Sequence, residues 1–246
     1  MLRFSQNSPE RIATLRARIA AAAASAGRNA DSVTLLAVSK GQPAELIRAA
    51  AAAGITDVGE SYLTEALGKM DALGDLALTW HFIGRLQANK TRHVAERFAW
   101  VHGLDRLKLA ERLATQRPYH APALNVCIQV NLGGEASKGG VPLEDAPVLA
   151  AAVAALPRLA LRGLMCIPPG ETDPVRQRAW FARLRALRDC LNAGGLGLDT
   201  LSMGMSGDFE AAIQEGATLV RIGTALFGPR ESRGLPGTPP ATIPAP

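Results

Sequence analysis

The chain has 246 residues and a formal net charge of +5 at pH 7, and 20% of its residues are charged. This length allows one large domain with its own core, or two small ones. The positive charge is spread along the sequence without a dense basic block or an interleaved aromatic set, so the composition gives little support to nucleic-acid binding.

Local patterns indicate neither membrane insertion nor metal binding. The longest wholly apolar run near the N-terminus, Ile19 to Ala24, is too short to span a bilayer and has no signal-peptide flanks. The three cysteines, Cys127, Cys166 and Cys190, lack metal-type spacing, and the four histidines are scattered. We therefore expect a cytoplasmic protein with reduced, mostly packed cysteines.

Secondary-structure signals divide the chain into a leading helix and a long alternation. Residues 8–26 are predicted to be helical, with Ser8 as the N-cap, Pro9 in the first turn and Gly27 after the end. Strand patterns then alternate with helix patterns. The expected strands cover 33–40, 57–61, 79–84, 100–105, 124–132, 161–167, 200–205 and 219–228. The expected helices cover 43–53, 62–71, 89–97, 106–117, 143–156, 174–193 and 208–215.

This alternation predicts an α/β fold with a parallel sheet covered by helices. Eight strand–helix units in about 200 residues favour a closed (β/α)8 TIM barrel, with the first helix as an extra element. A doubly wound open sheet is the alternative. We expect one domain over residues 1–230 and an irregular tail rich in proline and glycine over 231–246.

Lys40 ends the otherwise apolar run 33–40. At the carboxyl end of a buried strand its amine would lie at the mouth of the barrel. Partial desolvation disfavours the ammonium form, which lowers the pKa of the amine and lets it attack a carbonyl. The alternative is an ordinary solvated lysine.

The last two predicted strands end in small and hydroxyl-bearing residues. In barrels the loops after strands seven and eight frequently bind phosphate, and Ser206, Gly223 and Thr224 fit that role through N–H and O–H donors. The alternative is that Gly204 and Gly207 serve turns and that Ser206 caps a helix.

Arg221 stands in the apolar run 219–222, where a guanidinium needs an anion or another acceptor. Either a structural ion pair or a ligand ring nitrogen would satisfy it. A nucleophilic lysine, a phosphate site and an arginine near a ring nitrogen together suggest pyridoxal 5'-phosphate (PLP), held as an imine on Lys40. Two further strand residues, His81 and Met203, are assigned to the same site; His81 could equally be a hydrogen-bonded core histidine.

The sequence is similar to the YggS/PROSC-type PLP homeostasis proteins. The matching segments, in family order, are Leu36–Lys40 (LAVSK), Gly59–Tyr62 (GESY), Trp80–Lys90 (WHFIGRLQANK), Gln129–Leu132 (QVNL) with Glu135 and Lys138, Gly163–Met165 (GLM), Leu201–Ser206 (LSMGMS) and Val220–Gly228 (VRIGTALFG).

The resemblance implies a barrel like the N-terminal domain of alanine racemase, with PLP on Lys40, Arg221 at the pyridine nitrogen and the phosphate at Ser206, Gly223 and Thr224. The family commonly has asparagine near the cofactor where this chain has Ser61. The shorter serine would lose that contact or bridge it through water.

Three functions fit these residues: a PLP carrier in homeostasis, an amino-acid racemase and a lysine-dependent aldolase. A racemase needs a second acid/base opposite the lysine, and Tyr119 is expected at the wrong end of the barrel. The aldolase would require a carboxylate such as Glu60 and leaves Arg221 unexplained. We therefore expect a monomeric carrier without catalytic residues, which passes PLP to PLP-dependent apo-enzymes; the racemase is the alternative.

Overall fold

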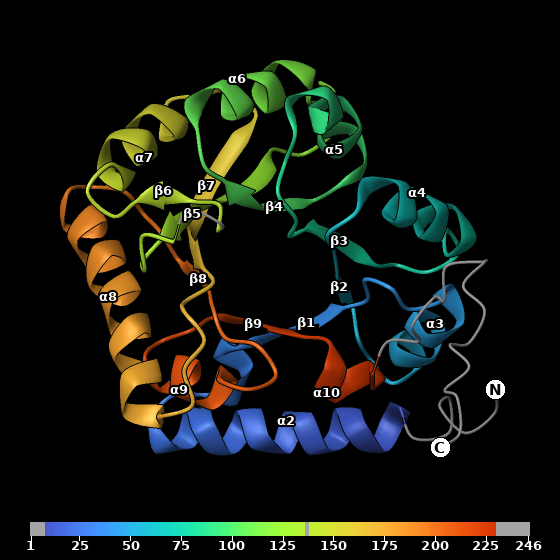
Figure 1. The fold of residues 1–246 in the computed structure, drawn as a ribbon. Helices are drawn as coiled ribbons and strands as arrows, with labels where there is room; N and C mark the ends of the chain where they lie inside the picture. The colour runs from blue at the N-terminus through green and yellow to red at the C-terminus, as the bar shows by residue number, and fades with distance from the viewer. Residues whose placement is uncertain (1–7, 136–137, 230–246) are drawn as a thin grey trace, which may run out of the picture.

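The computed structural model describes residues 8–135 and 138–229. Eight parallel strands form a closed barrel, and helices surround it (Figure 1). The strands of the barrel are β1 (Thr34–Val38), β2 (Asp57–Glu60), β3 (Thr79–Phe82), β4 (Trp100–Leu104), β5 (Leu124–Asn131), β7 (Leu159–Cys166), β8 (Thr200–Ser202) and β9 (Leu219–Ile222). The β4–β5 and β1–β9 pairings close the ring, which confirms the predicted TIM barrel over the open sheet.

Most strands are followed by a helix on the outside of the barrel. These helices are α3 (Ala44–Ala52), α4 (Leu63–Ala72), α5 (Thr91–Arg97), α6 (Leu107–Gln116), α7 (Ala146–Ala154), α8 (Pro174–Ala193), α9 (Phe209–Gln214) and α10 (Thr224–Phe227). Short 3-10 turns, η1 (Ala30–Ser32) and η2 (Ala88–Lys90), precede β1 and α5. The crossovers require this arrangement, because a parallel strand can only be reached by a connection over the face of the sheet.

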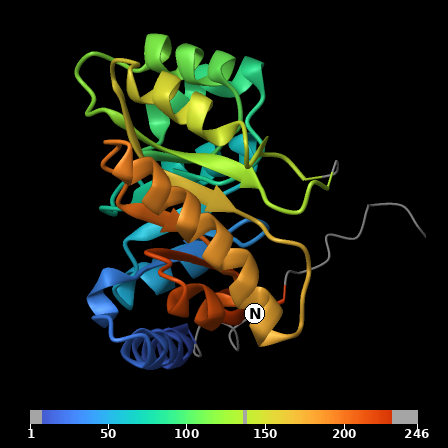
Figure 2. The same ribbon diagram turned by 90° about the vertical axis from the view of Figure 1, so that its left-hand side faces the viewer.

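The leading helix α2 (Ser8–Ser25) lies across the outside of the barrel against α9, α10 and α3 (Figures 1 and 2). It buries an apolar stripe at helical spacing that includes Ile12, Leu15 and Ile19. The eighth helix of the ring, α10, has a single turn and covers little of the sheet. The extra helix therefore supplies part of the outer layer that α10 leaves open.

Two expected strand ends are wrong in the region of the site. The strand expected over 219–228 ends at Ile222, and residues 224–227 turn into α10 with Gly228 donating to the Thr224 carbonyl. The apolar run is continuous there, so periodicity alone does not separate a buried strand from a buried helical turn. Similarly, β1 ends at Val38, and Lys40 lies in the turn that follows.

One strand was not predicted. The two-residue β6 (Val141–Pro142) pairs with the end of β5 and extends the edge of the sheet. It falls just before the helix expected over 143–156, which is shorter than expected at both ends. The expected tail over 231–246 lies outside the described residues.

Candidate functional site

The carboxyl ends of three neighbouring strands bring the predicted binding residues to one rim. β1 pairs with β9, and β9 pairs with β8. Lys40 follows β1, Gly223 and Thr224 follow β9, and Ser206 follows β8. Residues separated by more than 160 positions in sequence therefore share one face of the barrel, as the parallel topology demands.

The backbone on both sides of Lys40 is held by α4. Lys69 Nζ donates to the Ser39 carbonyl at 2.7 Å, and the Gly41 amide donates to Glu65 Oε1 at 2.6 Å. Lys69 and Glu65 also form an ion pair at 2.6 Å. The half-buried Lys40 thus sits in a turn that is fixed from the residue before it to the residue after it.

The buried carboxylate of Glu60 adds to these contacts, and we call Glu60, Glu65 and Lys69 together the clamp on the Lys40 turn. Glu60 ends β2, is wholly buried, and accepts from Lys69 Nζ at 2.6 Å and from Ser39 Oγ at 2.5 Å. Burial raises the pKa of the Glu60 carboxyl, although the hydrogen bonds from Lys69 and Ser39 oppose that rise. Its second oxygen, Oε2, has no hydrogen-bond partner. Glu60 is thus bonded to the residue before Lys40 and to α4, which gives it a structural role in holding the Lys40 turn.

The loops after β8 and β9 meet at the predicted phosphate corner. The Ala225 amide donates to Ser206 Oγ at 3.3 Å, which ties the two loops together. A Cβ on Gly223 would approach the Val38 carbonyl oxygen to 3.3 Å, so glycine lets the β9–α10 turn pack against the end of β1. Thr224 is exposed and begins α10. The corner therefore offers hydroxyl groups and closely packed backbone, which suits an anion.

Arg221 lies on β9, two residues before Gly223, and its side chain is buried. It is 5% exposed, and Nη1 donates to the Ser202 carbonyl at 2.6 Å and to Ser202 Oγ at 2.9 Å. Nη2 donates to the Cys166 carbonyl at 2.8 Å. Burial lowers the pKa of the guanidinium, but an arginine stays charged. The structural ion pair considered for Arg221 is absent among the described residues, where carbonyl and hydroxyl oxygens are its partners.

Below Arg221 a line of polar side chains crosses the barrel. His102 Nδ1 lies 2.8 Å from Ser202 Oγ, and His102 Nε2 lies 3.0 Å from His81 Nδ1. His81 Nε2 lies 3.0 Å from Asp57 Oδ1, at the start of β2. Both imidazoles are buried, whereas the Asp57 side chain reaches the surface at 23% exposure. The interior of this barrel is therefore not purely apolar.

The sequence was compared with protein families and with known proteins. Residues 11–231 match the family described as "Alanine racemase, N-terminal domain". The PLP homeostasis protein of Pseudomonas aeruginosa is 61% identical over 222 residues, which is 90% of this chain and 95% of that protein. The PLP homeostasis protein of Escherichia coli is 50% identical over 223 residues, covering 89% of this chain and 95% of that one.

This chain belongs to the PLP homeostasis protein family. A solved structure of PipY from Synechococcus elongatus, with PLP bound, superposes on it with a TM-score of 0.80 and 39% identity, over 89% of this chain and 99% of that one. The resemblance found in the sequence motifs is thereby confirmed, together with the alanine racemase-like barrel.

Of the other predicted site residues, His81 and Met203 are buried, whereas Ser61 lies at the rim. Both ring nitrogens of His81 face protein groups, so the geometry gives no support to a direct contact between His81 and a cofactor. Met203 is wholly buried in the main hydrophobic cluster. Ser61 follows β2 at the rim, where its carbonyl would lie 2.2 Å from a Cβ on Gly84.

Sequence reasoning missed Ser202 and His102. Both occupy strand positions whose side chains point into the barrel, and both were read as part of buried strands. A polar residue at an inward position of such a strand is the signal that marks them, because a buried polar group needs a partner. The partner itself comes from a strand 100 residues away.

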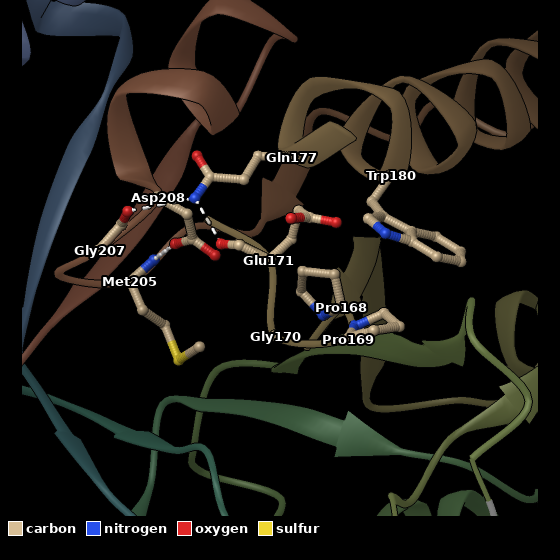
Figure 3. A pocket seen from close by; sticks show the side chains of 9 residues that line it. All are labelled: Pro168, Pro169, Gly170, Glu171, Gln177, Trp180, Met205, Gly207 and Asp208. Atoms are coloured by element: carbon tan, nitrogen blue, oxygen red, sulfur yellow. Dashed lines mark hydrogen bonds between the residues drawn. The ribbon is translucent and has the colours of Figure 1, made fainter. Parts of the chain in front are cut away.

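An open pocket of about 160 Å³ adjoins the rim between the β7–α8 and β8–α9 loops (Figure 3). Its walls combine apolar and polar groups, namely Pro168, Pro169, Gly170, Glu171, Gln177, Trp180, Met205, Gly207 and Asp208. Asp208 Oδ1 accepts from the Met205 amide and shapes the loop that carries Ser206. The predicted phosphate corner thus borders a hollow that opens to solvent.

The described residues contain no group of three histidines, cysteines or acidic residues placed to hold a metal. Within the same residues, no helix is long and apolar enough to cross a membrane. Burial raises the pKa of the Cys127 and Cys166 thiols to about 12, while Cys190 is exposed. The burial of Cys127 and Cys166 agrees with the expectation that most of the cysteines are packed.

Proposed function

We propose that this protein binds PLP as an imine on Lys40 and carries it for other proteins without catalysing a reaction of its own. The observation that carries the proposal is Arg221, a buried cation bonded to oxygen acceptors, below a rim that gathers Lys40, Ser206, Gly223 and Thr224. The PLP-bound relative and the names of the homologues support it.

The residues fit the chemical parts of PLP. Ser206, Thr224 and the backbone of the β9–α10 turn would hold the phosphate through hydroxyl and N–H donors. Arg221 would face the pyridine nitrogen, and Lys40 would attach the aldehyde. Ser61 lies on the same rim and is proposed to reach the cofactor through a bridging water.

Arg221 favours carriage over catalysis. PLP supplies an electron sink to its enzymes when it is bound, and that sink is strongest when the ring nitrogen is protonated. Arginine does not readily give up a proton, so Arg221 would keep the ring nitrogen unprotonated. The bound cofactor would then be a weak catalyst but still a reversible adduct of a single lysine.

Release follows from the same chemistry. An imine exchanges with an incoming amine, and the rim adjoins an open pocket through which an amine could approach. We propose PLP-dependent apo-enzymes as recipients, a monomeric carrier, and the cytoplasm as its location. Three cysteines without a disulfide, two of them buried, support a reducing compartment.

The test is attachment of PLP to Lys40. The purified protein loaded with PLP should show a visible absorbance band that borohydride abolishes, and peptide mass spectrometry should find the pyridoxyl adduct on Lys40. Lys40→Ala should lose the band, while Lys108→Ala, a change at an exposed lysine of α6, should keep it. An adduct on another lysine would overturn the proposal.

The racemase alternative rests on a second acid/base. Tyr62 is 65% exposed beside Ser61 at the rim, whereas Tyr119 is 93% exposed in the connection before β5, at the opposite end of the barrel. Incubating the PLP-loaded protein with L-amino acids in deuterated water decides between the two functions. We expect no D-isomer and no rapid exchange at Cα; either one would favour the racemase.

A further inference from the structure

The polar line across the barrel has chemically fixed ends. Arg221 can only donate hydrogen bonds, and an ionised Asp57 can only accept them. Burial tends to raise the pKa of Asp57, but hydrogen bonds from His81 and Thr56 bring it below its usual value, so the carboxylate is ionised at neutral pH. Any arrangement of protons between these two residues must satisfy both ends.

Only one arrangement with two neutral imidazoles does so. His81 Nε2 must carry a hydrogen for Asp57, which leaves His81 Nδ1 as an acceptor. His102 Nε2 must then donate to His81, and His102 Nδ1 must accept from the Ser202 hydroxyl. The Ser202 oxygen in turn accepts from Arg221. Each of the three intermediate groups donates once and accepts once.

Burial makes the neutral forms the stable ones. Desolvation lowers the pKa of His81, partly opposed by Asp57. Desolvation places the pKa of His102 well below its usual value, and repulsion from Arg221, and from His81 whenever that ring is protonated, adds to the effect. The ring of Trp100 stacks on His81 at 5.5 Å between centroids and 8° between planes. The guanidinium of Arg162 also lies over the Trp100 ring, 5.6 Å from its centroid.

We propose that His81, His102 and Ser202 are positioning residues for Arg221, joined in a one-way hydrogen-bond chain that runs from the guanidinium to Asp57. The role assigned to Arg221 rests on the proposed function. Ser202 is the side chain that Arg221 bonds among the described residues, and the histidines fix the direction of its hydroxyl. The chain thus keeps the guanidinium in one orientation towards the rim, and links a buried cation to a carboxylate at the far end of the barrel.

The first test uses the ligand-free protein and needs no substitution. Long-range proton–nitrogen NMR of histidine labelled with ¹⁵N should show His81 and His102 both neutral at pH 7, each with its proton on Nε2. A proton on Nδ1 of either ring, or a doubly protonated ring, would overturn the proposal.

The second test separates positioning from packing with a matched pair of variants. His102→Gln keeps one donor and one acceptor, whereas His102→Leu keeps a comparable volume and removes both. In the ligand-free protein, Arg221 guanidinium ¹⁵N signals should show faster rotation in His102→Leu and in Ser202→Ala than in wild type, with His102→Gln close to wild type. Equal rotation in all four proteins would overturn the positioning role.

A third measurement adds the ligand. His102→Leu should weaken PLP binding roughly fivefold relative to His102→Gln. The less ordered Arg221 guanidinium should cost about as much binding free energy as the loss of one hydrogen bond. Equal affinities would contradict the role. If wild type failed to bind PLP, the proposed function would fall, and the ligand-free NMR results would still decide whether the chain holds Arg221.

Discussion

At the scale of single residues, two glycines in the loop after β8 differ in how strictly the backbone requires a glycine. Gly204, directly after β8, has φ of +93°, and a Cβ there would meet the Ala212 Cβ at 2.6 Å and the Phe209 Cα at 3.0 Å. Gly207, three residues later in the same loop, has open space around it. The backbone therefore requires glycine at Gly204, where L side chains are strained, whereas Gly207 lies in the turn over 206–208 and has room for a side chain.

We expect Gly204→Ala to lower the free energy of unfolding by about 2 kcal/mol or more, since it combines a positive φ with a backbone clash. Gly207→Ala is the matched control and should change it by less than about 0.5 kcal/mol. Urea unfolding followed by circular dichroism measures both values. Equal stability of the two variants would show that the loop rearranges freely around Gly204.

The buried histidines predict how stability depends on pH. Burial holds the pKa of His102 and of His81 below the value of about 6.5 that a histidine has in the unfolded chain. Above that pH the two histidines are neutral in both the folded and the unfolded protein, so they do not lower the free energy of unfolding. Below that pH these histidines bind more protons in the unfolded chain than in the folded protein, so the free energy of unfolding falls as pH falls. Loss of the ionised Asp57 follows only at lower pH, since its pKa is below the usual value.

Between pH 7.0 and pH 5.5 we expect a loss of about 1 kcal/mol for each of the two buried histidines. Urea unfolding at the two pH values measures it. His102→Gln should remove about half of the difference, while a double change at the exposed His93 and His120 should retain it. The same unfolding free energy at both pH values in wild type would contradict this account.

At the scale of elements, α4 controls the turn that carries Lys40. Its residues Glu65 and Lys69 lie one helical turn apart and reach the Gly41 amide and the Ser39 carbonyl. Lys69 also neutralises the buried Glu60. At 7% exposure and with three bonded partners, Lys69 is a buried structural part of the clamp.

We expect Lys69→Met to lower the free energy of unfolding by about 3 kcal/mol, because the change leaves Glu60 charged and unpaired in the interior. The double change Lys69→Met with Glu60→Gln should recover part of that loss, since no buried charge is then left unpaired. Denaturant unfolding of the three proteins measures the effect. A single variant as stable as wild type would mean that Glu60 is not ionised in the fold.

At the scale of the whole molecule, closure of the barrel creates the interior of the site. β4 and β8 are separated in the sheet by β5 and β7, yet His102 and Ser202 meet at 2.8 Å because the ring brings opposite walls together. An open sheet would keep these two side chains apart. The polar chain below Arg221 is therefore a product of the topology as much as of the residues.

The amino-acid sequence alone was enough to predict the eight strand–helix units, the barrel and one common rim for Lys40 and Ser206, whereas the end of β9 before Gly223 and Thr224 came from the structure. The predicted features follow from periodicity and from the rule that parallel strands end on one face, and both are local properties of the chain. The tertiary structure alone decided the partners of Arg221, the clamp on Lys40 and the inward place of His81. Those contacts join residues from distant strands and helices, and a pattern along one strand cannot specify which polar group it will meet across a closed barrel.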